Sequence, residues 1–250
     1  MMRILLRAAY DGTAYHGWQA QPGVSTIEGE INKALSSVFE QDIQVTGGSR
    51  TDAGVHALCN VAVFDVDTRM EAGKIAYAVN TKLPEDIRIR SSRLVPPDFH
   101  PRKRESVKTY EYRIYRADFP MPVRRLYTFY THRKIDVAAM GAASAYLEGT
   151  HDFKSFCSPH TQAETTVRTI HLLDVREEGP ELVLIVSGNG FLYNMVRIIA
   201  GTLLDVGYGK YNAERVRDIL DGLDRELAGP TLPACGLTLT GYRFVDFPAL

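Results

Sequence analysis

The sequence of 250 residues is 45% hydrophobic and 24% charged, which is typical of globular proteins and excludes disordered and fibrous classes. Its longest apolar stretches, Leu182 to Val186 and Ile198 to Leu204, are far shorter than the roughly 18 residues that a membrane helix needs. The formal net charge of −1 gives no overall attraction to nucleic acid, so RNA binding would require an uneven distribution of charge.

Cysteine usage and the N-terminus bound the cellular setting. Cys59, Cys157 and Cys235 lie far apart and form no C-x-x-C pair, so neither a disulfide framework nor a zinc site is indicated. The N-terminus runs directly into a strand-like pattern, without the cleavage site of a signal peptide. These features predict a cytoplasmic protein with no membrane segment and no metal site.

The first part of the chain predicts strands and helices in the order βαββαβ. Ser25-x-x-Glu28 is a capping box that predicts the start of a helix, which ends near Phe39. Pro84 stops the second helix. The other predicted elements are strands over 3–9, 43–46, 60–66 and 87–94 and a helix over 71–82. This order is typical of the ferredoxin-like split unit, an antiparallel sheet with its helices on one face.

A linker is predicted where two prolines, Pro96 and Pro97, precede a charged run over 102–105. It divides the chain into halves over residues 1–103 and 104–250. In the second half, strands are predicted over 108–115, 170–176, 182–187 and 238–245, and helices over 137–147, 193–206 and 213–220. The sequence therefore predicts an α+β fold: two ferredoxin-like halves with mixed or antiparallel sheets, helices on one face, and an active-site cleft between the halves.

Positive charge gathers in the middle of the chain. Between Arg102 and Lys134, ten basic residues outnumber three acidic ones, and aromatic residues are interleaved with them. Cations bind phosphates and aromatic rings stack on bases, so this mixture suits RNA. A solvated strand with a charged outer face explains the same residues equally well. The residues predicted to contact phosphates are Arg102, Lys103, Arg104 and Arg125.

The densest polar segment is the glycine-rich run from Gly47 to Ala57, between two predicted strands. In it, Arg50 precedes Asp52 by two residues, and a nearby guanidinium would keep this carboxylate ionised and hold its orientation. An ionised, fixed carboxylate is a competent nucleophile. From these residues alone, a structural turn in which Thr51 and Asp52 bond to their own backbone is the commoner explanation.

Other catalytic classes lack their motifs. No phosphate-binding glycine loop, serine-hydrolase elbow or H-E-x-x-H zinc motif is present in the sequence. A metal-dependent nuclease would need carboxylates clustered around Asp52, and none are near it in sequence. A non-catalytic RNA-binding protein with tandem RRM-like folds stays an alternative, although the aromatic pattern of that domain is missing.

The run from Arg50 to Ala57, RTDAGVHA, resembles the signature of the tRNA pseudouridine synthase A family. Other segments resemble the same family in the same order, among them residues 10–13, 17–19, 99–102, 108–112, 152–156, 168–170, 191–197, 201–203 and 236–237. The resemblance therefore covers nearly the whole chain. It implies an isomerase without a cofactor that acts as a homodimer on tRNA, converting uridines at positions 38, 39 and/or 40 of the anticodon arm to pseudouridine.

The resemblance also implies roles for single residues. Asp52 matches the family's nucleophile and Arg50 the arginine just before it. Arg197 matches the arginine that pairs with the catalytic carboxylate. Tyr110 matches the tyrosine that stacks against the target base, and Leu237 an apolar residue on the other side of that base.

Two further residues carry expectations. Ser49 stands where the family usually has glycine, and serine tolerates a positive φ poorly, so the loop either keeps an ordinary conformation there or carries strain. Trp18, the only tryptophan, is expected in the core rather than stacked on RNA.

Overall fold

The structure is a computed structural model, and it describes residues 1–159, 161 and 163–247. The described chain divides into two compact units. Unit 1 comprises Met1–Ser106 together with the chain from Leu239 onward, and unit 2 comprises Val107–Thr238. The chain from Leu239 onward therefore returns to unit 1 after unit 2.

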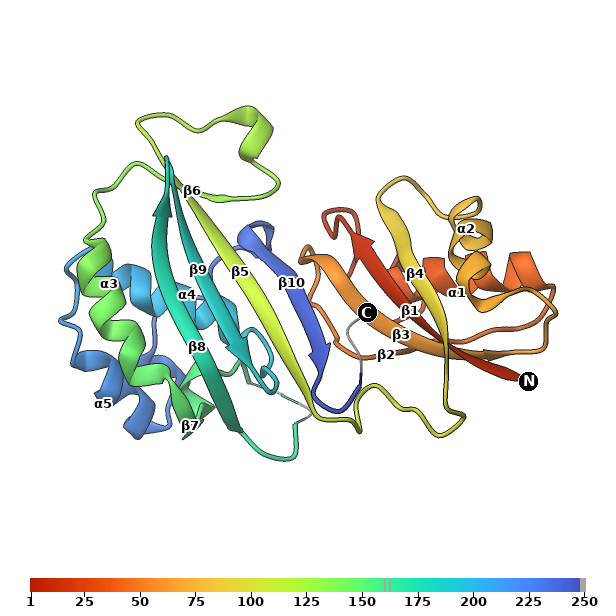
Figure 1. Cartoon of the computed structure of the whole chain (residues 1–250). Helices are drawn as coiled ribbons and strands as arrows, with labels where there is room; N and C mark the ends of the chain where they lie inside the picture. The colour runs from red at the N-terminus through yellow and green to blue at the C-terminus, as the bar shows by residue number, and fades with distance from the viewer. Residues whose placement is uncertain (160, 162, 248–250) are drawn as a thin grey trace. The chain divides into compact units, whose positions relative to one another are not determined.

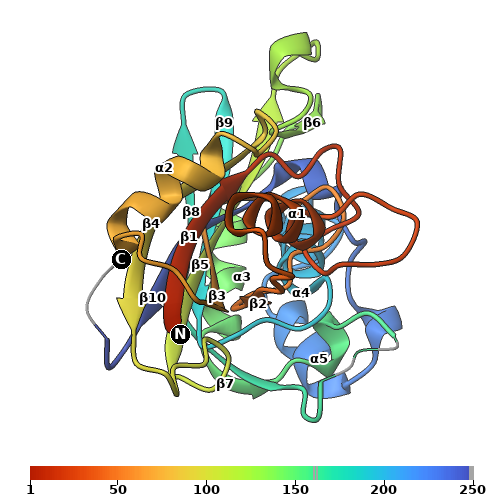
Figure 2. The same ribbon diagram turned by 90° about the vertical axis from the view of Figure 1, so that its right-hand side faces the viewer.

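Unit 1 is built on a largely antiparallel set of strands (Figure 1). Their order is β4-β1-β3-β10, and the two-residue β2 also pairs with β3. The strands are β1 (Met2–Tyr10), β2 (Thr46–Gly47), β3 (His56–Val66), β4 (Ile87–Val95) and β10 (Leu237–Phe244), which begins in unit 2. The helices α1 (Ile27–Phe39) and α2 (Ile75–Asn80) contact each other (Figure 2). The core of unit 1 includes Ile4, Leu6, Ile31, Leu35 and Trp18, which is 1% exposed. The core position expected for Trp18 is confirmed.

The predicted start of α1 is wrong by one residue. The N-cap is Thr26, whose extended backbone places its side chain to accept a hydrogen bond from Gly29 N at 3.2 Å. Glu28 does not close a capping box from Ser25, because its carboxylate accepts from Ala20 N at 2.8 Å. The second strand is also much shorter than predicted, since only Thr46 and Gly47 pair with β3.

Unit 2 contains strands in the order β5-β9-β8-β7, with β6 parallel to β5 and the other pairs antiparallel. They are β5 (Ser106–Arg116), β6 (Phe129–Thr131), β7 (Gly149–Asp152), β8 (Val167–Glu178) and β9 (Glu181–Gly188). Its helices are α3 (Val137–Ser144), α4 (Met195–Gly207) and α5 (Arg215–Gly222). Nearly every residue of α4 is buried, as expected for a helix that is apolar on all sides.

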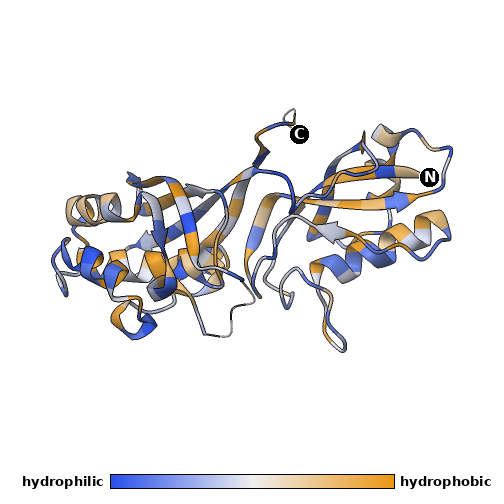
Figure 3. Cartoon of the chain, turned by 90° about the horizontal axis from the view of Figure 1, so that it is seen from below, coloured by the Kyte–Doolittle hydropathy of each residue, from blue (hydrophilic) through white to orange (hydrophobic). Residues whose placement is uncertain are grey.

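The described residues therefore form an α+β fold with mostly antiparallel pairing and five α-helices, which confirms the predicted class. Apolar and polar residues alternate along strands of both units (Figure 3), because successive side chains of a strand point to opposite faces. Within the part of the chain that the structure describes, no helix combines the length and apolar character needed to cross a membrane.

Candidate functional site

Residues 48–55, here called the Asp52 loop, connect β2 to β3 in unit 1 and carry Arg50 and Asp52. Backbone hydrogen bonds join the loop to the rest of unit 1: Gly48 N to Val61 O at 2.7 Å, Trp18 N to Thr51 O at 3.0 Å and Gly54 N to Tyr15 O at 3.2 Å. Within the loop, Val55 N donates to Asp52 O at 3.1 Å, and Gly54 has a φ of 78°. That left-handed conformation favours glycine over any other residue. The backbone of Asp52 is thus fixed on both sides.

Two glycines outside the loop, Gly12 and Gly17, let the backbone of the Asp52 loop lie directly against their own backbone. A Cβ atom on Gly12 would lie 2.1 Å from the carbonyl oxygen of Val55. A Cβ atom on Gly17 would lie 2.7 Å from the carbonyl oxygen of Thr51, and the φ of Gly17 is 87°. Backbone atoms cannot move aside as a flexible side chain can, so larger residues at these positions would displace the Asp52 loop.

A buried chain of polar side chains lies against the loop. The Tyr10 hydroxyl and Thr51 Oγ1 are 2.8 Å apart. Asn60, which is 0% exposed, donates from Nδ2 to the Tyr10 hydroxyl at 3.0 Å and to the Ser49 carbonyl at 2.8 Å. Buried polar groups are costly unless they are bonded, so this chain holds Ser49 and Thr51 in one arrangement. These two residues flank Arg50.

The loop ends at His56, a buried residue at the start of β3. Its Nδ1 lies 3.1 Å from Gly12 N, within hydrogen-bond distance. Asp11 Oδ1 is 3.1 Å from the same nitrogen. His56 therefore ties the end of the Asp52 loop to residues 11 and 12, in a supporting position.

Ser49 keeps an ordinary conformation. It is not among the non-glycine residues of the described chain that have a positive φ, which are Glu40, Asn194 and Leu223. Ser49 is buried, Arg50 is exposed and Asp52 is half-buried. The departure from the family's glycine therefore introduces no left-handed strain at this position, and the loop presents the Asp52 carboxylate from a fixed backbone.

In unit 2, Arg197 lies in the first turn of α4 and is half-buried. Its Nε donates to the Leu232 carbonyl at 2.6 Å, and its Nη1 donates to Asn194 Oδ1 at 2.6 Å. The backbone of Leu232 returns a bond from its N–H to the Arg197 carbonyl at 3.3 Å. The backbone carbonyl and the guanidinium of Arg197 are thus both bonded to Leu232, in the segment that leads to β10.

Tyr110 and Leu237 are buried at positions of unit 2 set by β5 and β10. Tyr110 is 6% exposed, lies opposite Val186 of β9, and meets the Phe191 ring edge to face, with centroids 5.2 Å apart. Leu237 opens β10 and is 5% exposed. In this structure Tyr110 has an aromatic partner, Phe191, to which the sequence assigned no role.

The segment from Leu232 to Leu237 packs between Arg197 and β5. The Tyr112 hydroxyl of β5 donates to the Pro233 carbonyl at 2.8 Å, and a Cβ atom on Gly236 would lie 2.7 Å from the Tyr112 ring. Burial raises the pKa of Tyr112, so this hydroxyl keeps its proton and remains a donor. The segment from Leu232 to Leu237 therefore binds Arg197 at one end and begins β10 at the other, and Tyr112 of β5 holds it in between.

The four residues expected to contact phosphates have different surroundings. Arg102 Nε donates to the Gly47 carbonyl at 2.9 Å, at the entrance of the Asp52 loop. Arg104 pairs with Asp246 at 2.6 Å and lies over the Phe99 ring. Lys103, in unit 1, and Arg125, in unit 2, are exposed. Arg102, Arg104 and Arg125, whose Nη1 donates to the Pro122 carbonyl at 3.1 Å, therefore also make contacts within the fold.

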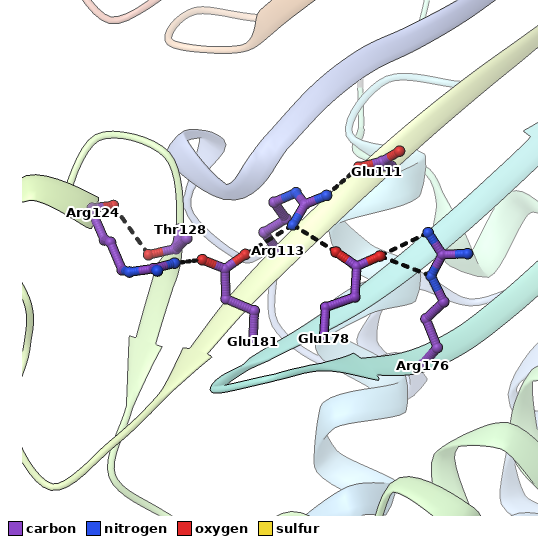
Figure 4. Close-up of polar contacts among 7 residues, drawn as sticks. All are labelled: Glu111, Arg113, Arg124, Thr128, Arg176, Glu178 and Glu181. Atoms are coloured by element: carbon purple, nitrogen blue, oxygen red, sulfur yellow. Dashed lines mark hydrogen bonds and ion pairs between the residues drawn. The ribbon is translucent and has the colours of Figure 1, made fainter.

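Three of the basic residues counted along the sequence of unit 2, Arg113, Arg116 and Arg124, pair with glutamates of the β8–β9 hairpin. Figure 4 shows Arg113 between Glu111, Glu178 and Glu181, at 2.9, 3.1 and 2.8 Å. Further pairs join Arg124 to Glu181, Arg176 to Glu178 and Arg116 to Glu177. Hydrogen bonding from Arg113 lowers the pKa of Glu178, which keeps that carboxylate charged. Among the described residues, no group of three or more His, Cys, Asp and Glu side chains is placed to hold a metal ion.

Comparison with known proteins gives one consistent result. A family model described as tRNA pseudouridine synthase matches residues 7–102 and 143–245. The chain is 45% identical over 240 residues to tRNA pseudouridine synthase A of Ruminiclostridium cellulolyticum, covering 96% of this chain and 98% of that protein. It is 46% identical over 239 residues to the protein of the same name from Brevibacillus brevis, with the same coverage of both chains.

Among solved structures, the crystal structure of a Cbf5-Nop10-Gar1 complex aligns with 80% of this chain and 54% of that chain. The TM-score is 0.32 and the sequence identity 14%, which is too low to support an argument about the fold. The residues matched by the family model include Arg50, Asp52, Arg197 and Leu237, whereas Tyr110 lies outside them.

Proposed function

Because this chain belongs to the tRNA pseudouridine synthase family, it is an isomerase that forms pseudouridine in tRNA, and we propose that it acts on one or more of uridines 38, 39 and 40 of the anticodon arm. The observation that carries the proposal is the family match to both segments that hold charged site residues. The Asp52 loop lies in the first matched segment and Arg197 in the second. No cofactor enters the proposed reaction.

Asp52 acts as the nucleophile in this proposal. It attacks the uridine at ribose C1′ or at base C6, or it abstracts a sugar proton, and each route requires an ionised carboxylate in a fixed pose. The fixed backbone of the Asp52 loop supports this role, because a short side chain takes most of its aim from its own backbone. Arg50 and Arg197 are proposed to stabilise the charge of Asp52.

The target base must leave its stack before the bond from C1′ to N1 can be reached. Tyr110 is proposed to stack on the flipped uridine and Leu237 to contact its other side. Both side chains are almost fully buried in the structure. Their surfaces would therefore have to become accessible to a base when tRNA binds.

Finer features of the architecture remain proposals as well. Unit 1 supports a ferredoxin-like split arrangement, because its elements follow the order βαββαβ and β4, β1, β3 and β2 are neighbours in that order. We extend the same arrangement to unit 2 as a proposal. The enzyme is proposed to work in the cytoplasm as a homodimer, with tRNA phosphates contacted by Arg102, Lys103, Arg104 and Arg125.

The first experiment incubates the protein with unmodified tRNA transcripts, without metal or nucleotide, and maps pseudouridine by chemical labelling. We expect product at one or more of positions 38, 39 and 40. Product confined to other positions would contradict the proposed target. Tight binding without product on every transcript would instead favour the alternative of a non-catalytic RNA-binding protein.

The nucleophile is tested with Asp52→Asn, which keeps the size of the side chain but removes its charge and nucleophilicity. We expect this variant to fold and bind tRNA as the unchanged protein does, and to form no detectable pseudouridine in a single-turnover assay. Asp67→Asn, at an exposed aspartate just after β3, is the matched control and should be fully active. Turnover by Asp52→Asn above the level of deamidation would place the nucleophile elsewhere.

Phosphate contacts are tested by the salt dependence of tRNA binding. Alanine at Lys103 and Arg125 should lower affinity and reduce the slope of log K against log salt by about one for each lost contact. Arg102→Ala and Arg104→Ala are measured separately, since the contacts of these residues with Gly47 and Asp246 can alter the fold. Unchanged slopes would show that the basic run is a solvated face.

The proposed homodimer is tested by light scattering at micromolar concentration, which should report twice the monomer mass. A fully active monomer would contradict the homodimer.

A further inference from the structure

Asn194 has an unusual conformation for the residue that precedes a helix. It is the N-cap of α4, yet its φ of 60° and ψ of 7° place it in the left-handed region, and its side chain makes no capping hydrogen bond. An asparagine at an N-cap ordinarily has extended backbone and accepts a bond from an N–H of the first turn. Non-glycine residues rarely adopt a positive φ, and where they do, contacts with the surrounding structure hold them there.

The side chain of Asn194 is used for two other contacts. Its Oδ1 accepts from Arg197 Nη1 at 2.6 Å, and its Nδ2 donates to Ser158 Oγ at 2.9 Å. A guanidinium has only donors, so it fixes which end of the amide faces Arg197. The Ser158 backbone is held as well, since its N–H donates to the Tyr193 carbonyl at 3.1 Å. The amide is therefore clamped at both ends.

We propose that Asn194 is a positioning residue that sets the direction of the Arg197 guanidinium for its role in the reaction, an inference that rests on the proposed function of Arg197. Arginine has a long side chain with many rotamers, and a defined pose requires anchors along it. The Leu232 carbonyl holds Nε and the Asn194 amide holds Nη1. With two of its nitrogens placed, the planar guanidinium has its plane and direction set.

The chemistry of the two anchors fits this role. Both acceptors are neutral, a backbone carbonyl and a side-chain amide, so they orient the guanidinium without cancelling its charge. A carboxylate in the place of Asn194 would compete with Asp52 and with RNA phosphate for the same cation. The left-handed backbone of Asn194 fits this role, because its side chain bonds to Arg197 and Ser158 instead of capping α4.

The test compares Asn194→Gly with Asn194→Ala. Glycine accepts a positive φ and loses only the side chain, whereas alanine loses the side chain and strains the backbone. We expect Asn194→Gly to slow pseudouridine formation at saturating enzyme by about tenfold or more, as misplacement of a site group does, with the Kd for tRNA unchanged within about twofold. A merely structural role would weaken folding and binding together. Ser158→Ala, which removes the second contact of the amide, should slow the reaction less and leaves the backbone of Asn194 untouched.

A double-mutant cycle with Arg197→Ala decides between the outcomes. If Asn194 acts through Arg197, Asn194→Gly adds no further loss in the Arg197→Ala protein. Independent, multiplying losses would show that Asn194 acts elsewhere and would overturn the inference. An active Asn194→Gly protein beside an impaired Arg197→Ala protein would overturn the inference and leave the proposed function standing. A fully active Arg197→Ala protein would remove the proposed role of Arg197 and the inference with it.

Discussion

The backbone of Asp52 in unit 1 is held by the hydrogen bonds of its loop, whereas the side chain of Arg197 in unit 2 is held at two of its own nitrogens. The Asp52 loop is joined to unit 1 by backbone hydrogen bonds and rests against glycines. Arg197 is anchored at Nε and Nη1. The difference follows from side-chain length: a short aspartate has little rotamer freedom beyond its backbone, while an arginine carries about 2 kcal/mol of rotamer entropy. Placing a short charged group thus requires a rigid loop, and placing a long one requires acceptors along it.

The largest expected effect comes from breaking the backbone placement of the Asp52 loop. Gly12→Ala would put a Cβ atom 2.1 Å from the Val55 carbonyl oxygen and should cost at least about 3 kcal/mol of stability in unit 1. Urea unfolding followed by fluorescence of Trp18, which is buried in unit 1, measures this directly. Gly73→Ala is the control, because no atom lies within 4 Å of its added Cβ. Equal midpoints for both variants would contradict close packing at Gly12.

Arg197→Lys should act on the reaction and leave unit 1 unchanged. A lysine ammonium is a point charge and cannot reproduce the bonds of Nε and Nη1 together. We expect the single-turnover rate to fall by about 10- to 100-fold, which corresponds to roughly 1.4 to 2.7 kcal/mol. The unfolding midpoint reported by Trp18 should not move. Arg217→Lys, at an exposed position of α5, is the matched control, and an equal loss there would show a nonspecific effect.

Tyr10→Phe tests how far side chains contribute to the placement of Asp52. It removes the hydroxyl that bonds to Thr51 and Asn60, and leaves their buried polar groups with fewer partners, at a cost of about 1 to 2 kcal/mol. The same change at Tyr77, which is 78% exposed, should have no effect on unfolding. A loss as large as that of Gly12→Ala would mean that side chains, not backbone contacts, place the loop.

Ser49→Gly should have the smallest effect. Because Ser49 does not need a positive φ, glycine offers no relief of strain. It removes a small buried side chain and adds freedom to the unfolded chain, which lowers stability by about 1 kcal/mol. Urea unfolding and the single-turnover rate both measure it. A clear gain in stability or rate would reveal strain at Ser49 that its φ does not show.

Much of the fold could be predicted from patterns of apolar residues and from turn residues. The order βαββαβ in unit 1, the α+β class and the core position of Trp18 were predicted correctly. Sequence patterns failed where a contact distant in sequence decides the outcome. Glu28 bonds Ala20 instead of completing a capping box, and β10 joins strands made much earlier in the chain. Neither choice has a local signal.

The site shows the same division. The Asp52 loop and Arg197 could be proposed because their segments resemble a family, whereas the residues that hold them could not be predicted. Asn194 has no local pattern that marks its contacts with Arg197 and Ser158. The charge count over 102–134 also missed distant partners, because Glu177, Glu178 and Glu181 lie far along the sequence yet pair with three of its arginines, Arg113, Arg116 and Arg124. Ion pairs across strands are visible only in three dimensions.

The return of β10 to unit 1 has a consequence for synthesis on the ribosome. Unit 2, Val107–Thr238, is inserted between the first strands of unit 1 and the strand that pairs with β3. At roughly 5–20 residues per second, making the insertion takes on the order of ten seconds. Throughout that time the part of the β3 edge that β10 later occupies has no partner strand, whereas Ala62 and Val63 of β3 already pair with β2. An open strand edge is a template for pairing between chains. The nascent protein therefore passes through an aggregation-prone interval that ends only when its last strand emerges.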